Sequence, residues 1–246
     1  MTAYEVIPVE VGWREADTSM FLYLTGAGQP AKISYRLWVV RNGRQTILVD
    51  SGVPIDEARQ RGVSDARDVE EALRSVSIDL REIEIVALTH LHWDHASNAV
   101  RFPRATFVAQ QAELDALREP FRANPSIGRF YSEDVDKFHS LVDRGRFRLL
   151  KGDESIAEGL DALHVGGHTP GSQVVVVRTR EGPAVICGDV IPLNRNYLDN
   201  IPNGIHIDVR QAIAAIERVR QLEPASLYAG HDPQSKLQLQ SLESHS

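Results

Sequence analysis

A His-x-His-x-Asp-His segment at residues 90–95 constrains this chain more than any other sequence feature. Only Thr89 separates it from the apolar run Ile85–Leu88, which has the composition of a buried strand. Side chains two positions apart in an extended segment point to the same side, so His90 and His92 can reach one point. The aspartate and histidine that end the segment come where the chain turns, and they can reach a second point nearby. Imidazole and carboxylate groups together are ligands for zinc, and also for manganese, cobalt or iron.

Chance does not explain this cluster. The chain has nine histidines among 246 residues, so three at these offsets would arise in about 1% of chains of this composition. That figure does not yet require the aspartate. A single histidine would more often be an ordinary core or surface residue, but the whole segment indicates a metal site.

Three further candidate ligands follow other predicted strands. His168 lies in Gly-Gly-His-Thr-Pro-Gly, Asp189 in Cys-Gly-Asp and His231 in Gly-His-Asp. Each comes directly after a glycine, which lets the backbone turn sharply and approach an ion closely. One such residue alone would more often be an ordinary loop residue. Three of them, each after its own strand, indicate strands that converge on a common edge.

The rest of the chain alternates between strand and helix patterns. The clearest helix is Val209–Leu222, with an apolar stripe and Asp208 at its N-cap position. Strands interleaved with helices, without repeats or an evident linker, predict a single mixed α/β domain over residues 1–246. The predicted strands are 37–40, 46–49, 83–88, 106–109, 147–150, 160–164, 174–178, 184–187 and 226–229. The other predicted helices are 69–76 and 110–117, and residues 118–140 are predicted to be a loop or irregular helices.

Composition limits the classes of function. The formal net charge of −7 disfavours binding to nucleic acid. Cys187 is the only cysteine, so no disulfide can form within the chain. Residues 1–13 lack the basic start and apolar core of a signal peptide, and the apolar runs are too short to cross a bilayer. These observations predict a cytoplasmic enzyme that acts on a small molecule, without nucleic-acid or membrane partners.

The complete pattern resembles the metallo-β-lactamase superfamily. The resemblance covers nearly the whole chain, from Leu37 to His231. It implies a four-layer αβ/βα sandwich, in which two mixed β-sheets are flanked by helices and the site lies at one edge of the paired sheets. It also implies two Zn²⁺ ions, with Mn²⁺, Co²⁺ or Fe²⁺ as alternatives. When the family's ligand pattern is transferred to this sequence, the resemblance implies that the first ion is bound by His90, His92 and His168. The second ion is then bound by Asp94, His95 and His231, and Asp189 bridges the two.

Two aspartates receive further roles from this resemblance. Asp50 lies in Val-Asp-Ser-Gly, which matches the family's Asp-Thr-Gly turn with serine for threonine. The resemblance implies that Asp50 orients metal ligands and binds no metal itself. Asp94 is the expected catalytic residue, because it can bind a metal through one oxygen and pass a proton with the other.

Within the superfamily, the chain is similar to the N-acyl-homoserine lactone lactonase and 4-pyridoxolactonase-like group. It shares His-Leu-His-Trp-Asp-His-Ala-Ser-Asn, Gly-His-Thr-Pro-Gly-Ser-Gln at 167–173, and Asn-Gly-Ile-His-Ile-Asp before the last helix. A long N-terminal loop at 13–36 is also expected. True β-lactamases of this fold lack the bridging aspartate. The resemblance implies that a lactone or related cyclic ester-like ring is opened by a hydroxide that bridges two metals.

One position departs from the group. Lactonases of the best-known type have a tyrosine three residues after the bridging aspartate, where this chain has Pro192. Tyr197 and His206 are candidates to replace that tyrosine, although a residue of this kind is more often an ordinary loop residue. We therefore expect a lactone other than acyl-homoserine lactones. The predicted pocket residues are Met20, Phe21, Phe121, Phe130, Tyr131, Tyr197 and His206, with local core or a homodimer contact as the alternatives for the aromatic ones.

Three other functions remain open at this point. A dinuclear hydrolase of another ester, a thioester, an amide, a carbamate or a phosphodiester would use the same metal site. A non-catalytic metal-binding module is a second alternative, but degenerate relatives usually lose ligands and all seven positions are filled here. A mononuclear iron oxygenase of the same fold would leave the complete second ligand set unexplained.

Overall fold

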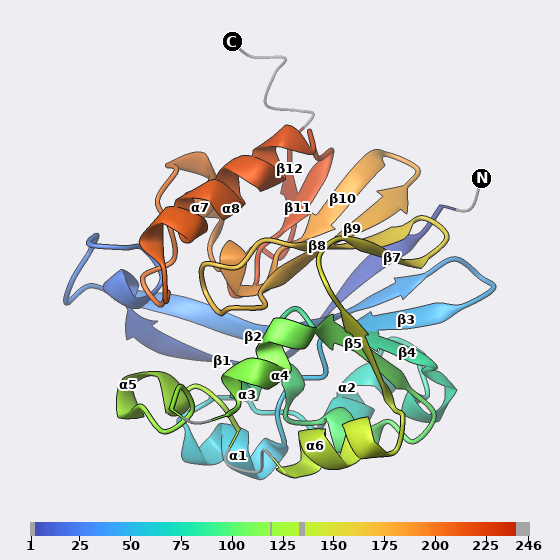
Figure 1. Ribbon diagram of the computed structural model, residues 1–246. Coiled ribbons are helices and arrows are strands. Elements are labelled where there is room, and N and C mark those ends of the chain that lie inside the picture. Colours follow the sequence, from blue (N-terminus) through green and yellow to red (C-terminus); the bar gives the residue numbers. More distant parts are fainter. Residues whose placement is uncertain (1–2, 119, 133–135, 240–246) are drawn as a thin grey trace.

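The computed structural model describes residues 3–118, 120–132 and 136–239. Two six-stranded sheets pack face to face, and helices lie on the outer side of each (Figure 1). The helices of the first half of the chain lie below the first sheet in that view, and the last long helix lies above the second (Figure 1).

The first sheet holds the N-terminal half of the strands and the second sheet holds the rest. The first is formed, in spatial order, by β1 (Glu5–Asp17), β2 (Pro30–Arg41), β3 (Thr46–Val49), β4 (Ile85–Ala87), β5 (Thr106–Gln110) and β6 (Phe147–Leu150). The second is formed by β7 (Glu154–Ala157), β8 (Leu160–His164), β9 (Gln173–Thr179), β10 (Gly182–Ile186), β11 (Ser226–Tyr228) and β12 (Leu237–Gln238). Both sheets are mixed, because β3 to β6 run parallel and β10 pairs parallel with β11, while the other pairs are antiparallel.

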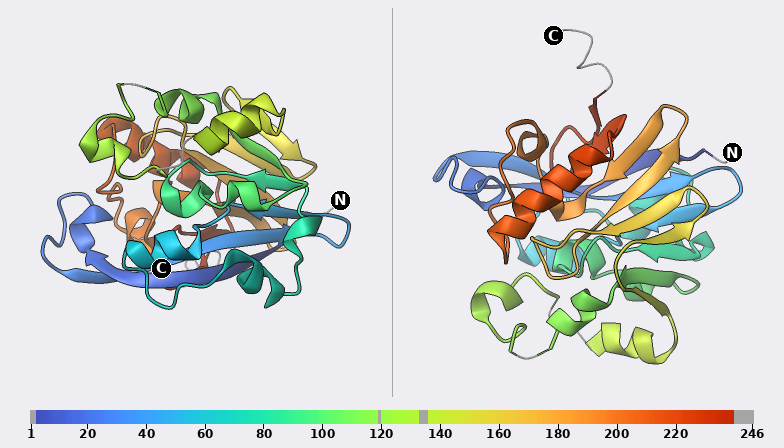
Figure 2. Two further views of the ribbon diagram at one scale, coloured as in Figure 1. Left: turned by 90° about the horizontal axis from the view of Figure 1, so that it is seen from below. Right: turned by 45° about the horizontal axis from the view of Figure 1, so that its top comes forward.

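The helices are short except for one. On the side of the first sheet lie α1 (Ile55–Gln60), α2 (Val69–Arg74), α3 (Trp93–Ala96), α4 (Gln111–Ala116), α5 (Pro125–Gly128) and α6 (Asp136–Asp143). On the side of the second sheet lie α7 (Asn194–Leu198) and α8 (Val209–Gln221), which runs across the sheet (Figure 2). None of the helices in the described ranges is long and apolar enough to span a membrane.

Alternating side chains of the strands separate three apolar cores. In β2, Leu37 and Val39 pack under the helices of the first half, whereas Trp38 and Val40 pack between the two sheets. In β10, Val185 packs under α8, and its neighbours on the strand face the other sheet. Successive strand side chains point to opposite faces, so an apolar strand covered on both sides supplies two cores at once. Three cores separate four layers, which confirms the predicted αβ/βα sandwich.

The predicted N-terminal loop at 13–36 is wrong in half of its length. Strand β1 continues to Asp17 and β2 already begins at Pro30, and the two pair antiparallel along their whole length. Polar residues such as Arg14 and Glu15 interrupt the apolar alternation, because β1 is an edge strand with partly exposed positions. Only residues 18–29 connect the two strands.

The last helix follows its prediction at the start and departs from it on one face. The Asp208 carboxylate accepts hydrogen bonds from the backbone N–H groups of Arg210 and Gln211, as an N-cap does. Ile213, which belongs to the predicted apolar stripe, is instead 46% exposed. The buried side of α8 is formed by Ala212, Ala215, Ile216 and Val219.

Candidate metal centre

The seven predicted ligands come together at one edge of the paired sheets. They sit where strands end, because the carboxyl ends of β4, β10 and β11 meet there and the turn between β8 and β9 reaches the same point. All seven side chains are buried. Their donor atoms form two sets, each within 4.8 Å, which are His90, His92, His168 and Asp189 in the first and Asp94, His95 and His231 in the second.

Asp189 joins the two sets through its two carboxylate oxygens. Oδ2 lies 3.4 Å from Nε2 of His168 in the first set. Oδ1 lies 2.9 Å from Nε2 of His231 and 3.2 Å from Nε2 of His95 in the second set. A carboxylate placed in this way can bind a cation on each side.

The first set presents ring nitrogens to one another. Nε2 of His168 lies 3.2 Å from Nε2 of His90 and 3.0 Å from Nδ1 of His92. Burial lowers the pKa of all three histidines, and the positive charge that each would place on its neighbours lowers the pKa of His90 and His92 further. Neutral imidazoles leave lone pairs on the converging nitrogens, which fits a divalent cation between them.

The second set combines histidines with carboxylates. Burial alone would lower the pKa of His95, but the carboxylates of Asp94 and Asp189 outweigh it and raise that pKa above its usual range. The pKa of His231 is raised in the same way. Nε2 of His95 and Oδ1 of Asp189 are buried and make no hydrogen bond to a described residue. Unsatisfied buried polar atoms that face one another fit a cation that binds both.

The outer ring nitrogens of His95, His168 and His231 bond to carbonyl or carboxylate oxygens. Nδ1 of His168 donates to the carbonyl of Ile205 at 2.6 Å, and Nδ1 of His231 donates to the carbonyl of Ser34 at 2.9 Å. Each bond places the proton on the outer nitrogen and leaves the inner nitrogen free to bind a metal.

Asp50 lies behind the ligands, where the sequence predicted a supporting residue. Its Oδ2 lies 2.7 Å from Nδ1 of His95, and its carboxylate also accepts hydrogen bonds from the backbone N–H and the hydroxyl of Thr89. Asp50 has a φ of 61°, which is rare for a residue other than glycine. The left-handed turn directs its carboxylate back under the ligand segment instead of toward a metal.

Glu113 in α4 is a supporting residue that sequence reasoning missed. The carboxylate is fully buried and accepts hydrogen bonds from the backbone N–H of Leu91, the backbone N–H of Gly171 and the hydroxyl of Thr169. Leu91 lies between two ligands of the first set, and Thr169 follows His168. Glu113 therefore ties together the two loops that carry the first set. Nothing in the sequence indicated this role, because a glutamate in the first turn of a helix is usually exposed to solvent.

A hollow of about 250 Å³ opens beside the first set of ligands. Phe130, Tyr131 and His206 line it, as the sequence predicted for the substrate pocket. The other four predicted pocket residues do not line it. Phe21 and Phe121 pack in the first core, Met20 packs against that core, and Tyr197 packs in the third core with Arg220 over its ring. Residues that the prediction did not include are Ser126, Arg129, Thr169, Gly204, Ile205 and Ile207.

Pro192 is buried and does not line this hollow. Its carbonyl instead accepts a hydrogen bond from the backbone N–H of His231 at 2.7 Å. The residue that stands where lactonases have tyrosine therefore holds the loop of a candidate ligand and offers no side-chain donor to a substrate.

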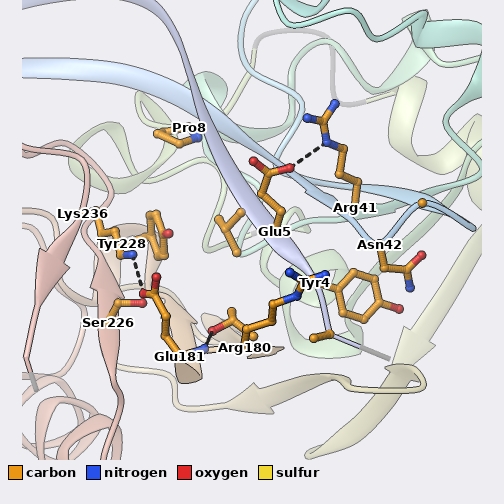
Figure 3. A pocket seen from close by; sticks show the side chains of 14 residues that line it. Tyr4, Glu5, Pro8, Arg41, Asn42, Arg180, Glu181, Ser226, Tyr228 and Lys236 are labelled. Carbon is orange, nitrogen blue, oxygen red and sulfur yellow. Dashed lines mark hydrogen bonds and ion pairs between the residues drawn. The ribbon is translucent and has the colours of Figure 1, made fainter. Parts of the chain in front are cut away.

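A second hollow of about 870 Å³ lies at the opposite end of the strands (Figure 3). Its lining includes Glu181, at the start of β10, whereas Asp189 follows the other end of that strand. Two ion pairs lie there, Arg41 with Glu5 and Lys236 with Glu181 (Figure 3). This larger hollow therefore plays no part in the candidate metal centre.

The chain has relatives of the same fold. An N-acyl homoserine lactonase of Bacillus sp is 24% identical to this chain over 204 residues, which are 76% of each chain. A probable metallo-hydrolase of Methanocaldococcus jannaschii is 24% identical over 162 residues, which are 66% of this chain and 63% of that protein. A solved structure of an N-acyl homoserine lactone hydrolase with the product N-hexanoyl-L-homoserine bound at its catalytic metal centre has a TM-score of 0.79 at 19% identity, over 100% of this chain and 98% of that one. A quorum-quenching N-acyl homoserine lactone lactonase has a TM-score of 0.78 at 21% identity, over 95% and 94%. The family model of the metallo-beta-lactamase superfamily matches residues 36–231, so most of this chain carries the family pattern and the chain belongs to that superfamily.

Proposed function

We propose that this metal-dependent hydrolase opens a lactone or a related cyclic ester-like ring at a centre of two zinc ions. The observation that carries the proposal is the position of Asp189, whose two oxygens face two separate sets of buried ligands. The activity named for relatives such as the Bacillus lactonase supports the substrate class.

The ligand assignment follows the two sets of donor atoms. We assign His90, His92 and His168 to the first ion. The second ion takes Asp94, His95 and His231, and Asp189 bridges the two. Zinc suits a set of imidazole and carboxylate ligands, and Mn²⁺, Co²⁺ or Fe²⁺ would accept the same donors.

The bound ions would acidify a water molecule and polarise the carbonyl oxygen of the substrate. The proton transfers would be carried out by side chains of the protein, and Asp94 is the candidate. Oδ2 of Asp94 lies 3.5 Å from Nε2 of both His95 and His231, so this oxygen faces the ligand set. We assign Oδ1 to proton transfer toward the alkoxide that leaves when the ring opens.

The substrate is a small molecule, and we infer that acyl-homoserine lactones are not the best ones. Pro192 offers no donor to the carbonyl oxygen as it becomes negatively charged. Loss of one such donor typically costs about 10²- to 10³-fold in turnover. A homodimer stays a prediction from the sequence.

The test is hydrolysis by metal-loaded protein across four substrate classes. We expect acid release from simple aliphatic or aromatic lactones to exceed that from long-chain acyl-homoserine lactones, and to exceed hydrolysis of thioesters and phosphodiesters. A strong preference for long-chain acyl-homoserine lactones would overturn the inference from Pro192. Turnover of a phosphodiester or thioester without any lactone would overturn the proposed substrate class and leave the metal site standing.

A further inference from the structure

We propose that His206 recognises a hydrogen-bond donor, a hydroxyl or an amide N–H, on the group that the substrate carries beside its lactone ring. The inference rests on the proposed lactone hydrolysis and assigns a specificity-determining residue to it. The features of the hollow beside the first ligand set carry it.

The hollow reaches from the ligands to a loop before α8. Its lining includes the candidate ligands His92 and His168. Residues 204–207 form one part of its wall, and Ser126, Ile127, Arg129, Phe130 and Tyr131 form another. A substrate whose ring reaches the candidate ligands therefore places its substituent against these two segments.

The His206 ring is fixed in this wall by two contacts. Its Nδ1 lies 2.7 Å from the carbonyl oxygen of Asn203. The edge-to-face contact with Tyr23 holds the ring plane, with centroids 4.7 Å apart and an interplanar angle of 81°. The Asn203 amide in turn donates to the backbone carbonyl of Asp189 at 2.7 Å, so the loop is anchored to the candidate bridging residue.

These contacts determine what His206 offers to a ligand. A carbonyl oxygen can only accept, so Nδ1 carries the proton of the neutral ring and Nε2 is left as an acceptor. No hydrogen bond of Nε2 to a described residue occurs, and the ring is only half-buried. His206 therefore presents a fixed acceptor at the wall of the hollow.

Three other polar side chains of the hollow are less suited to this task, and Tyr131, which also lines it, packs in the first core. Thr169 already donates its hydroxyl to Glu113. Arg129 and Ser126 are exposed, and the guanidinium of Arg129 lies over the Phe130 ring, 4.8 Å from its centroid. A flexible exposed arginine can attract an anion, but it does not define the direction of a hydrogen bond as the fixed imidazole does.

The remaining lining limits the size and polarity of the substituent. Ile127, Phe130, Ile205 and Ile207 supply apolar surface. The volume of about 250 Å³ lies below the range of about 300–1,000 Å³ that is usual for sites of drug-sized ligands. The structure thus favours a compact, largely apolar substituent with one donor, and it disfavours a long acyl chain.

The experiment compares matched lactones on the metal-loaded full chain. The substrates are a parent γ-lactone, its hydroxyl-bearing and short-chain amide-bearing derivatives, and the corresponding methoxy and N-methyl-amide compounds. The variants are His206→Phe, which removes the acceptor, and His206→Gln, which keeps one. His139→Phe in α6 is the matched control, because it makes the same substitution outside the hollow.

We expect His206→Phe to lower kcat/KM for the better donor-bearing lactone by about 10- to 100-fold and to leave the parent lactone within about threefold. His206→Gln should restore part of the loss, and the methoxy or N-methyl compound should be insensitive to all variants. The two donor-bearing substrates show whether a hydroxyl or an amide is the preferred source. Equal losses on all lactones, or no loss on any, would overturn the role of His206. If the unmutated protein hydrolysed no lactone at all, the proposed function itself would fail.

Discussion

The carboxylate of Asp50 lies 2.7 Å from Nδ1 of His95 and bonds Thr89, the residue before the His-x-His-x-Asp-His segment, at the same time. One buried side chain thus sets the orientation of a candidate ligand and the path of the strand end that carries the others. The left-handed backbone at Asp50 makes this reach possible.

Asp50→Asn should weaken metal binding without removing a ligand. The amide loses the negative charge that holds the proton on Nδ1 of His95, and supporting partners of this kind typically contribute about 10- to 100-fold in metal affinity. Competition with a chelator measures the change. Asp65→Asn is the control, because Asp65 also has a positive φ but is exposed and bonds Trp13 instead. Equal affinities for the two variants would contradict the role of Asp50.

The metal-loaded protein should contain close to two ions per chain. Six outer ligands and a bridging carboxylate exceed the four positions that one tetrahedral zinc offers. Elemental analysis after dialysis measures the content, and a chelator should remove activity that added zinc restores. A content of one ion with full activity and no gain on added zinc would exclude the dinuclear assignment.

Asp189→Asn should leave less residual activity than Asp94→Asn. The first change removes the charge that would hold two cations close together, whereas the second removes one ligand and one proton carrier. Turnover and metal content should be measured together for both variants. His139→Ala should behave like the unmutated protein, since His139 belongs to neither ligand set. Near-normal turnover with both metals in Asp189→Asn would mean that this residue does not bridge.

Glu113→Gln should destabilise the fold around the first ligand set. Oε1 accepts from Thr169 and Gly171, and Oε2 accepts from Leu91, so an amide nitrogen in either position meets an N–H or O–H donor. A buried donor left without a partner costs about 1–3 kcal/mol, which denaturant unfolding can measure. Glu217→Gln on the exposed side of α8 should change the free energy of unfolding by less than about 0.5 kcal/mol. Similar values for the two variants would show that Glu113 does not tie the loops together.

Local patterns in the sequence predicted most central strands and the ligand set. Strands such as Thr46–Val49 and Phe147–Leu150 are confirmed residue for residue, because buried strands of a covered sheet are apolar runs that end at turns. The edge strand β1 escaped prediction, because its polar positions look like a loop until β2 is seen to pair with it. The segment 118–140 was predicted to be a loop or irregular helices, and its described residues include the short helix α5 and the first part of α6.

The sequence by itself determined the candidate ligand set, since histidines and aspartates that follow strands indicate metal ligands wherever the strands lie. Only the tertiary structure decided which side chains surround them. Glu113 is 22 residues from Leu91 and 56 from Thr169, and His206 faces the hollow because its loop folds back onto His168. Tyr197, which the sequence predicted as a pocket residue together with His206, packs in the third core and does not line the hollow. Contacts between segments that are distant in the sequence depend on how the layers pack, and local residue spacing does not predict that packing.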